Sequence, residues 1–393
     1  MLPVAPDSLW WLAAVPLIAV LHELGHALAA GPAGYRVTSF GVGHGKPLLR
    51  WRLRSGTIVY LGRWLVSGGL CVAIPVEPVP ARRWLYHSGG LIFQGLLALL
   101  LWPLAGFFPV LENVFWFNLA VIAWNLVPVR VGGYATDGWQ LLADLFRPAT
   151  TGHVFTARAQ VERVLRFESR VGSPLGVTWC RLTLRWMDIV VGLDDDDWRP
   201  DEVMLMAETQ LEALHGYVTA ERHRVEGRSL AALHTVRELR RAWGAHLPPL
   251  ALDMLTVAEA RAFIAQEEPK LAQQAIARLA GAKGVVAHDA AAIELAAALQ
   301  LADVEVVEVA ARRLIPLLDG GMLDAPEAVR SVWDASAALK EEGRLTSAED
   351  LGREARAAAR HLIASAAPQD KVSIAARLGE VAGVTITHKS AGP

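Results

Sequence analysis

The chain has 393 residues, enough for two or more domains, and a mean hydropathy of +0.30 with 53% hydrophobic residues indicates that part of it lies in lipid. Its net charge of −2 and the lack of a basic stripe argue against a nucleic-acid-binding protein. The two cysteines, Cys71 and Cys180, have no CxxC partner, so we assign them neither a disulfide nor a metal-binding role.

Residues 9–30 form the first apolar segment, and they predict a membrane-spanning helix about 33 Å long. The motif His22-Glu23-Leu24-Gly25-His26 lies inside this segment. Residues four apart share one face of a helix, so both imidazoles can bind a single zinc ion while Glu23 acts on a water molecule beside it. Three ionisable groups in a membrane helix are costly without such a partner, which favours a metal site over two unrelated core histidines.

Two further membrane helices are expected at about residues 89–110 and 114–129, which together with the first make a three-helix transmembrane catalytic core. Between the first two helices, residues 34–76 alternate apolar and polar side chains and contain several glycines. This pattern predicts a small β element.

Charge predicts the orientation of these helices. Residues 32–87 carry eight basic side chains against the single acid Glu77, whereas the connection between the second and third helices has no basic residue. The positive-inside rule therefore places residues 32–87 in the cytoplasm. The third helix then returns the chain to the cytoplasm, so we expect an integral membrane protein, of the cell membrane, with a cytoplasmic C-terminal region.

The character of the chain changes near Phe146. Residues 1–146 hold 9 basic and 6 acidic side chains, and the remainder holds 29 and 34. We interpret residues 1–146 as the transmembrane core and 147–199 as a linker or membrane-proximal segment. Residues 200–393 are predicted to be a soluble α-helical domain, because no apolar run there is long enough to cross a membrane. Stacked helical hairpins are one arrangement of it, although no fixed repeat period is evident.

A catalytic zinc takes three protein ligands, so a third ligand must follow the first helix. Asp137 is the best candidate, and it follows Asn125-Leu-Val-Pro128 in the sequence. With this pairing the chain resembles the site-2 protease family, intramembrane zinc metalloproteases in which an HExxH helix is combined with a later NxxP...DG motif. The resemblance implies that Asp137 is the third ligand. Competing candidates from the cytoplasmic connection are His44, Glu77 and His87, and Asp137 can alternatively cap the helix that begins near Gly138.

The resemblance covers about residues 8–146. It includes Ser67-Gly68-Gly69, similar to a glycine pair that follows a β strand in the family, and Ser88-Gly89-Gly90 of the second helix. Three positions depart from the family pattern. Gln94 stands where an Asn is common, Thr136 replaces a usual Leu, and the gap from Pro128 to Asp137 is longer than in the compact form of the motif.

These features predict an intramembrane zinc endopeptidase that hydrolyses a peptide bond of a membrane-anchored protein near the cytoplasmic face. Glu23 is the predicted catalytic residue, and His22, His26 and Asp137 are the predicted metal ligands. Asn125 is a candidate substrate-binding residue, with a hydrogen bond between helices as its alternative role. The resemblance implies substrates such as membrane-tethered regulators, cut in regulated intramembrane proteolysis, or signal-peptide remnants. The helical C-terminal domain is expected to bind a protein partner.

Two other functions compete with proteolysis. One is a non-proteolytic membrane scaffold or metal-binding protein whose helical tail binds partners, although metal storage does not require a carboxylate beside the first ligand. The other is a metal transporter, which should carry polar groups along several spanning helices, whereas the second helix offers only Gln94.

Overall fold

The computed structural model describes residues 10–76, 82–131, 134–146, 158–191, 198–202, 205, 208–282, 284–318, 325–365 and 368–383. The described chain is mainly helical, with two two-stranded sheets of order β1-β2 and β3-β4. It divides into two compact units. Unit 1 comprises Met1–Ala149 and Val164–Val177, and unit 2 comprises Thr150–Arg163 and Thr178–Pro393. The predicted domain boundaries at residues 146 and 199 stay predictions.

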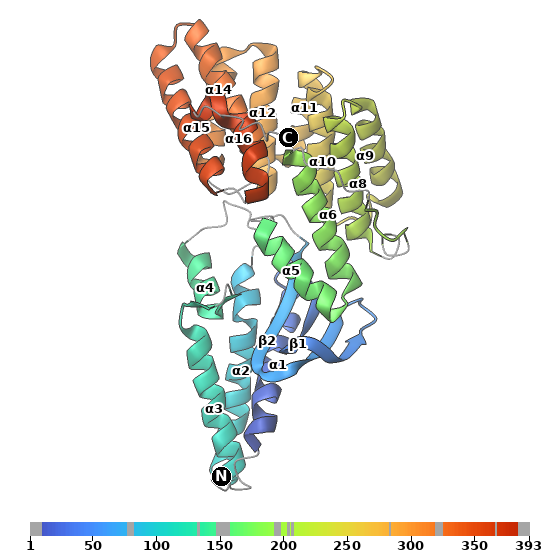
Figure 1. Cartoon of the computed structure of the whole chain (residues 1–393), viewed down its shortest axis with the longest axis vertical. Coiled ribbons are helices and arrows are strands. Elements are labelled where there is room, and N and C mark those ends of the chain that lie inside the picture. The colour runs from blue at the N-terminus through green and yellow to red at the C-terminus, as the bar shows by residue number, and fades with distance from the viewer. Residues whose placement is uncertain are drawn as a thin grey trace, which may run out of the picture. The chain divides into compact units, whose positions relative to one another are not determined.

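Helices α1 (Trp10–Ala30), α2 (Arg83–Ala105) and α3 (Pro109–Leu126) lie side by side in unit 1 (Figure 1). Two of them, α1 over Ala13–Ala30 and α2, are long and apolar enough to cross a membrane. Helix α3 is less apolar because it carries Glu112 and three asparagines. The two spans support membrane association, and the predicted third span stays a prediction.

The second helix begins and ends earlier than hydropathy predicted. It covers Arg83–Ala105 instead of 89–110, and α3 begins at Pro109 instead of residue 114. The apolar run continues through Phe107 and Phe108, but these residues form the turn between the two helices. Proline is well tolerated in the first turn of a helix, where its missing N–H is not needed, so Pro109 marks the start of α3.

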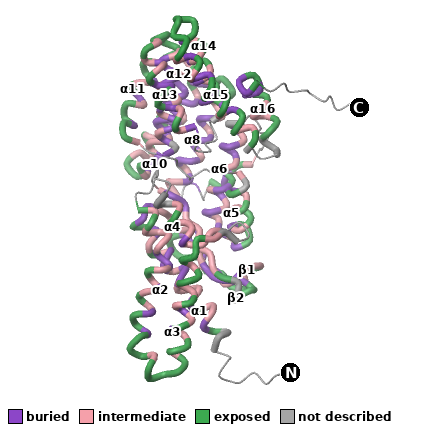
Figure 2. Tube along the Cα trace, turned by 90° about the vertical axis from the view of Figure 1, so that its left-hand side faces the viewer, coloured by how far each residue is buried: buried purple, intermediate pink, exposed green. Residues whose placement is uncertain are grey.

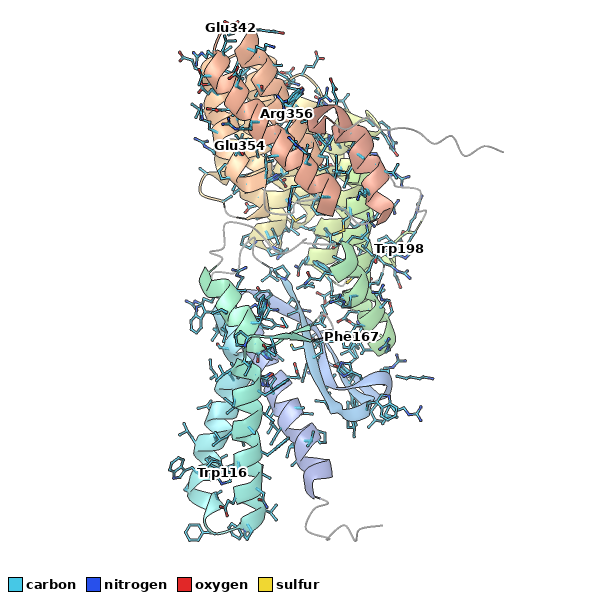
Figure 3. All side chains as sticks on the ribbon, turned by 60° about the vertical axis from the view of Figure 1, so that its left-hand side comes forward. Trp116, Phe167, Trp198, Glu342, Glu354 and Arg356 are labelled. Carbon is cyan, nitrogen blue, oxygen red and sulfur yellow. The ribbon has the colours of Figure 1, made fainter. Side chains whose placement is uncertain are left out.

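Glycines allow α1 and α2 to approach closely. A Cβ atom on Gly89 of α2 would lie 2.6 Å from the carbonyl oxygen of Gly25 in α1, so the contact requires glycine. Close contact through small residues is a common way for helices to associate in lipid. The outward side chains of α2 and α3 are largely exposed and apolar, as for Leu99, Trp102 and the labelled Trp116 (Figures 2 and 3).

The predicted β element at 34–76 consists of two long strands, β1 (Tyr35–Arg52) and β2 (Ile58–Pro75). Their register shows that the first half of β1 has a neighbour on each side, because Ser39 faces both Val72 and Ile58. The second half of β1 pairs with β2 on one side only among the described strands, from Pro47↔Gly62 to Arg52↔Ile58. The first half of β1 is therefore the buried centre of the sheet, and residues 47–52 form an edge.

Helices α5 (Arg158–Val171) and α6 (Pro174–Val191) lie in the segment predicted as a linker. The end of α5 and the start of α6 belong to unit 1, where Phe167 and Val171 pack against Ile58 and Tyr60 of the sheet (Figure 3). Glu168 is fully buried in this contact. Its Oε1 atom accepts hydrogen bonds from the hydroxyls of Ser39, at 2.6 Å, and Thr38, at 3.2 Å.

Unit 2 is built of helical hairpins. Helices α8 and α9, α10 and α11, α12 and α13, and α14 and α15 pack in pairs, and the first helix of each pair also contacts the first helix of the next (Figure 1). Such stacking gives a solenoid with one continuous core. The pairs begin at residues 209, 249, 285 and 325, so the spacing is irregular and a fixed period is hard to detect. The bounds are α8 Thr209–Val225, α9 Ser229–Trp243, α10 Pro249–Ile264, α11 Pro269–Ile276, α12 Val285–Leu301, α13 Val304–Leu318, α14 Ala325–Glu341, α15 Leu345–Ser365 and α16 Pro368–Ala382.

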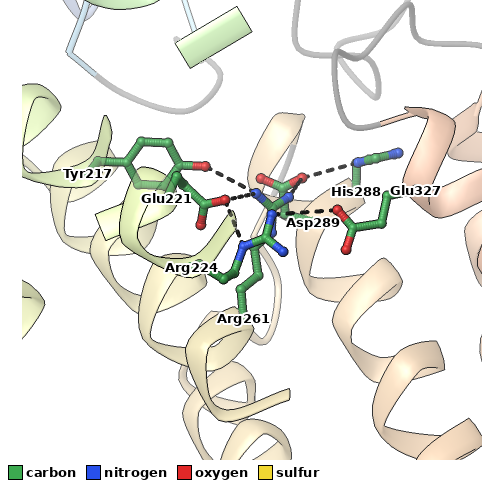
Figure 4. Close-up of polar contacts among 7 residues, drawn as sticks. All are labelled: Tyr217, Glu221, Arg224, Arg261, His288, Asp289 and Glu327. Carbon is green, nitrogen blue, oxygen red and sulfur yellow. Dashed lines mark hydrogen bonds and ion pairs between the residues drawn. The ribbon is translucent and has the colours of Figure 1, made fainter. Parts of the chain in front are cut away.

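A buried ionic network joins successive hairpins (Figure 4). Arg261 of α10 lies at its centre and contacts Glu221 of α8 at 3.3 Å and Asp289 of α12 at 3.0 Å. Removing one member of such a network leaves a buried charge unpaired, which is strongly destabilising. The network therefore ties each hairpin to specific neighbours. It comprises Tyr217, Glu221, Arg224, Arg261, His288 and Asp289, and Arg224 also contacts the exposed Glu327.

We predict that Glu168→Ala lowers the free energy of unfolding by about 1–3 kcal/mol, because the substitution leaves the buried Ser39 hydroxyl without its acceptor, whereas the Thr38 hydroxyl can still donate to the Val72 carbonyl oxygen. Burial raises the pKa of Glu168 in spite of the hydrogen bonds from Ser39, Ser173 and Thr38, so a neutral acceptor is tolerated there. Glu168→Gln should therefore cost less than Glu168→Ala. Thermal unfolding of the full chain in detergent measures both variants, and equal stability of the two would contradict the assigned role.

Candidate metal centre

Two imidazoles on α1 face one another across a single helical turn. His22 and His26 are each 7% exposed, and their Nε2 atoms lie 3.1 Å apart. The i, i+4 spacing places both side chains on the face of α1 that packs against α2. The face of α1 that the motif predicts to bind the metal therefore points to the protein interior.

Asp137 completes a group of three potential ligands. Its Oδ2 atom lies 3.1 Å from Nε2 of His22, and its Oδ1 atom lies 3.3 Å from Nε2 of His26. The three residues offer ligand atoms that all lie within 4.8 Å of one another. Residues 111 positions apart in the sequence therefore converge where the start of α4 (Asp137–Phe146) reaches α1.

Thr136 and not Asp137 caps helix α4. The backbone N–H of Trp139 donates to Oγ1 of Thr136 at 3.3 Å, and the backbone N–H of Gln140 donates to the carbonyl oxygen of Thr136 at 3.1 Å. The Thr136 hydroxyl in turn donates to the carbonyl oxygen of Val127 at 2.6 Å. A threonine that accepts from the third helical residue is a standard N-cap. The departure at Thr136 thus has a structural reason, and the carboxylate of Asp137 is left to face the histidines.

Each imidazole is held by a second contact on its other nitrogen. Nδ1 of His26 donates to the backbone carbonyl oxygen of Tyr86 at 2.7 Å, and Nδ1 of His22 donates to Oε1 of Gln94 at 3.0 Å. Both acceptors lie on α2. These contacts place the proton of each neutral ring on Nδ1, which leaves a lone pair on each Nε2.

The resulting arrangement fits a metal ion. Two Nε2 lone pairs and a carboxylate converge on one place, and acceptors that face one another repel unless a cation lies between them. The separations of 3.1–3.3 Å match the edge of about 3.3 Å that a tetrahedral site with bonds of 2.0–2.1 Å would have. Two imidazoles and a carboxylate are also a donor set that zinc uses in catalytic sites.

The ionisation of Asp137 suits this role. Burial tends to raise its pKa, but the two adjacent imidazoles outweigh that effect and hold the pKa below the ordinary value for an aspartate. The side chain therefore carries its negative charge at neutral pH, the form in which a carboxylate binds a metal.

Glu23 lies beside the three ligands on the same helix. It is 7% exposed, and its carboxylate accepts a hydrogen bond from the backbone N–H of Cys71 in β2. Strand β2 approaches closely at this point, because a Cβ atom on Gly69 would lie 2.7 Å from Oε1 of Glu23. The glycine in the Ser67-Gly68-Gly69 segment thus makes room for the predicted catalytic carboxylate.

Gly90 has the same role for the first histidine. A Cβ atom on Gly90 would lie 2.5 Å from Cε1 of His22, so no larger residue fits without moving the ring. Sequence reasoning noted Gly90 and Gln94 on the second helix without assigning them to His22. The only indication of this role in the sequence is a polar residue, Gln94, in an apolar helix, four positions after Gly90.

The other predicted site residues lie outside this group. Asn125 is half-buried in the last turn of α3 and stays a predicted substrate contact. His44 lies in β1 and His87 in α2, and among the described residues neither belongs to the group that could hold a metal. Glu77 lies outside the described residues.

Comparison with known proteins finds one family match, over the N-terminal part of the chain. The model of Peptidase family M50 matches residues 10–109. No curated protein and no solved structure matches the chain. The matched region is 100 of the 393 residues, contains the HExxH helix, the sheet and α2, and ends before Asp137. The resemblance inferred from the sequence is confirmed over residues 10–109, which match peptidase family M50, the family of the site-2 proteases.

Proposed function

We propose that this protein is an intramembrane zinc endopeptidase that cleaves membrane-anchored proteins near the cytoplasmic face. The observation that carries the proposal is the convergence of His22, His26 and Asp137 at one buried place, with Glu23 beside them on α1. The two apolar helices and the family match support a membrane setting. Location in the cell membrane and a cytoplasmic C-terminal region remain part of the proposal.

In this proposal Nε2 of His22, Nε2 of His26 and the carboxylate of Asp137 would hold the metal. Zinc in such a site supplies Lewis-acid chemistry, which polarises a carbonyl group and acidifies water. Glu23 accepts the proton of the attacking water and passes it to the leaving amine. The Cys71 N–H holds the Glu23 carboxylate in place for both transfers. Gln94 and the Tyr86 carbonyl keep both imidazole protons on Nδ1.

The substrate must expose its scissile bond before this chemistry can occur. Peptide groups in a helix are already hydrogen-bonded, so a membrane-spanning substrate has to unwind locally. Residues 69–75 of β2, beside Glu23, form the other edge of the sheet among the described strands and offer main-chain groups that can pair with an extended segment. Candidate substrates are membrane-tethered regulators or signal-peptide remnants. We further propose that the hairpins of unit 2 bind a protein partner, because solenoid surfaces commonly do so.

Replacing Glu23 with Gln tests the catalytic assignment. The amide cannot accept a proton, so cleavage of a membrane-anchored reporter should fall by about 10²–10⁴-fold while bound zinc stays near the wild-type amount. Metal content by elemental analysis and reporter cleavage in proteoliposomes measure the two effects. Unchanged cellular function of the Glu23→Gln variant would instead support a non-proteolytic scaffold.

Replacing Asp137 with Asn tests the third ligand. The amide keeps the size of the side chain but removes the charge, so zinc affinity should fall by more than about 100-fold, beyond the loss expected from an indirect contact. Competition with a chelator of known affinity measures the change. Asn125→Ala is the matched control and should leave zinc affinity unchanged. Equal affinities for Asp137→Asn and wild type would remove Asp137 from the ligand set.

Gln94 allows a test of how the first histidine is held. Gln94→Leu removes the acceptor of the His22 Nδ1 proton, so zinc affinity should fall by about 10–100-fold although no ligand has changed. Gln94→Glu retains an acceptor oxygen and should restore most of the affinity. Ser88→Ala, on the same helix, serves as the control. If Gln94→Leu binds zinc as tightly as the wild type, the hydrogen bond does not position His22.

A further inference from the structure

The second half of β1 carries an unusual concentration of positive charge. Residues 46–64 contain Lys46, Arg50, Arg52, Arg54 and Arg63 and no acidic residue. All five cations are exposed. Within the described part of the chain, none of the four cations in residues 46–54 forms an ion pair. We call residues 46–54, together with Arg63 and Trp64, the cationic edge.

Large apolar side chains are exposed between these cations. Trp51 is 54% exposed and Trp64 is 62% exposed, and the guanidinium of Arg63 lies 5.7 Å from the centre of the Trp64 ring. Side chains alternate between the two faces of a strand, so Arg50 and Arg52 point to one face while Leu49 and Trp51 point to the other. The edge strand is therefore amphipathic, with Arg50 and Arg52 on one face, where Arg50 lies against Gly172, and Leu49 and Trp51 on the other. Its exposed large apolar residues are Leu48, Leu49, Trp51, Leu53 and Trp64.

The sheet connects this edge to α1, a helix long and apolar enough to cross a membrane. Gly69 of β2 lies against Glu23, seven residues before the end of α1 at Ala30, which corresponds to about 10 Å along the helix axis. Gly69 faces Val42 across the sheet, and the chain turns just beyond Val42 to enter the cationic edge. The cationic edge is therefore the outer part of a sheet that packs against the last turns of α1.

We propose that the cationic edge binds the headgroups of anionic phospholipids in the same membrane that holds α1 and α2. Phosphate groups satisfy the arginines and Lys46, while Trp51, Trp64 and the leucines lie at the boundary with the acyl chains, where amphipathic aromatic side chains are favoured. The bound lipid fixes the outer strand of the sheet whose opposite part contacts Glu23. This inference rests on the membrane setting of the proposed function and is independent of peptidase activity.

The full chain in neutral detergent tests the proposal. Short-chain phosphatidylglycerol is titrated against short-chain phosphatidylcholine, with lipid retention measured by native mass spectrometry and stability by thermal unfolding. Wild type should retain phosphatidylglycerol preferentially, and the preference should weaken as salt is raised. Arg50→Gln, Arg52→Gln and Arg54→Gln combined should weaken that binding by about 100-fold.

The matched control combines Arg237→Gln, Arg241→Gln and Arg353→Gln, three exposed arginines of unit 2, and should bind phosphatidylglycerol like wild type. Glu23→Gln should also bind normally, which separates this test from the test of proteolysis. Equal retention of the two lipids by wild type would overturn the proposal, as would full retention by the triple variant. An equal stabilisation by inorganic phosphate or by a polyglutamate peptide would also overturn it, because the partner would then be free phosphate or an acidic protein.

Discussion

The convergence of unshared electron pairs at one buried place is the constraint on which unit 1 depends. Nε2 of His22 and Nε2 of His26 lie 3.1 Å apart, and the negatively charged carboxylate of Asp137 lies beside both nitrogens. In water such groups would be separately hydrated, but here they are largely removed from solvent, and a bound cation relieves their mutual repulsion. Metal affinity and the stability of this region are therefore coupled.

The packing around the site follows from this constraint. Helix α2 supplies the acceptors that hold both imidazoles, and it can approach α1 only because Gly25, Gly89 and Gly90 have no side chains. Strand β2 reaches Glu23 through Gly69 for the same reason. Thr136 fixes the start of α4 and so aims Asp137 at the histidines. The glycines act by letting backbone approach closely, and Thr136 acts by orienting Asp137.

Local pattern was sufficient to predict some parts of this arrangement. Helical spacing alone predicts that His22 and His26 share a face, and alternation with glycines predicts the β element. The third ligand needed the paired motif, because nothing local distinguishes Asp137 from a helix cap. Hydropathy misplaced the ends of α2, since Phe107 and Phe108 are apolar yet form a turn. Contacts between distant segments gave no sequence signal: Glu168 meets Ser39 across 129 positions, and Gln94 meets His22 across 72.

X-ray absorption at the zinc edge of the purified chain tests the central claim most directly. The account predicts one zinc per chain, bound by two imidazole nitrogens and carboxylate oxygen at about 2.0–2.2 Å, with no sulfur ligand. A chain that binds no zinc at stoichiometric levels, or a spectrum with a sulfur scatterer at about 2.3 Å, would contradict it.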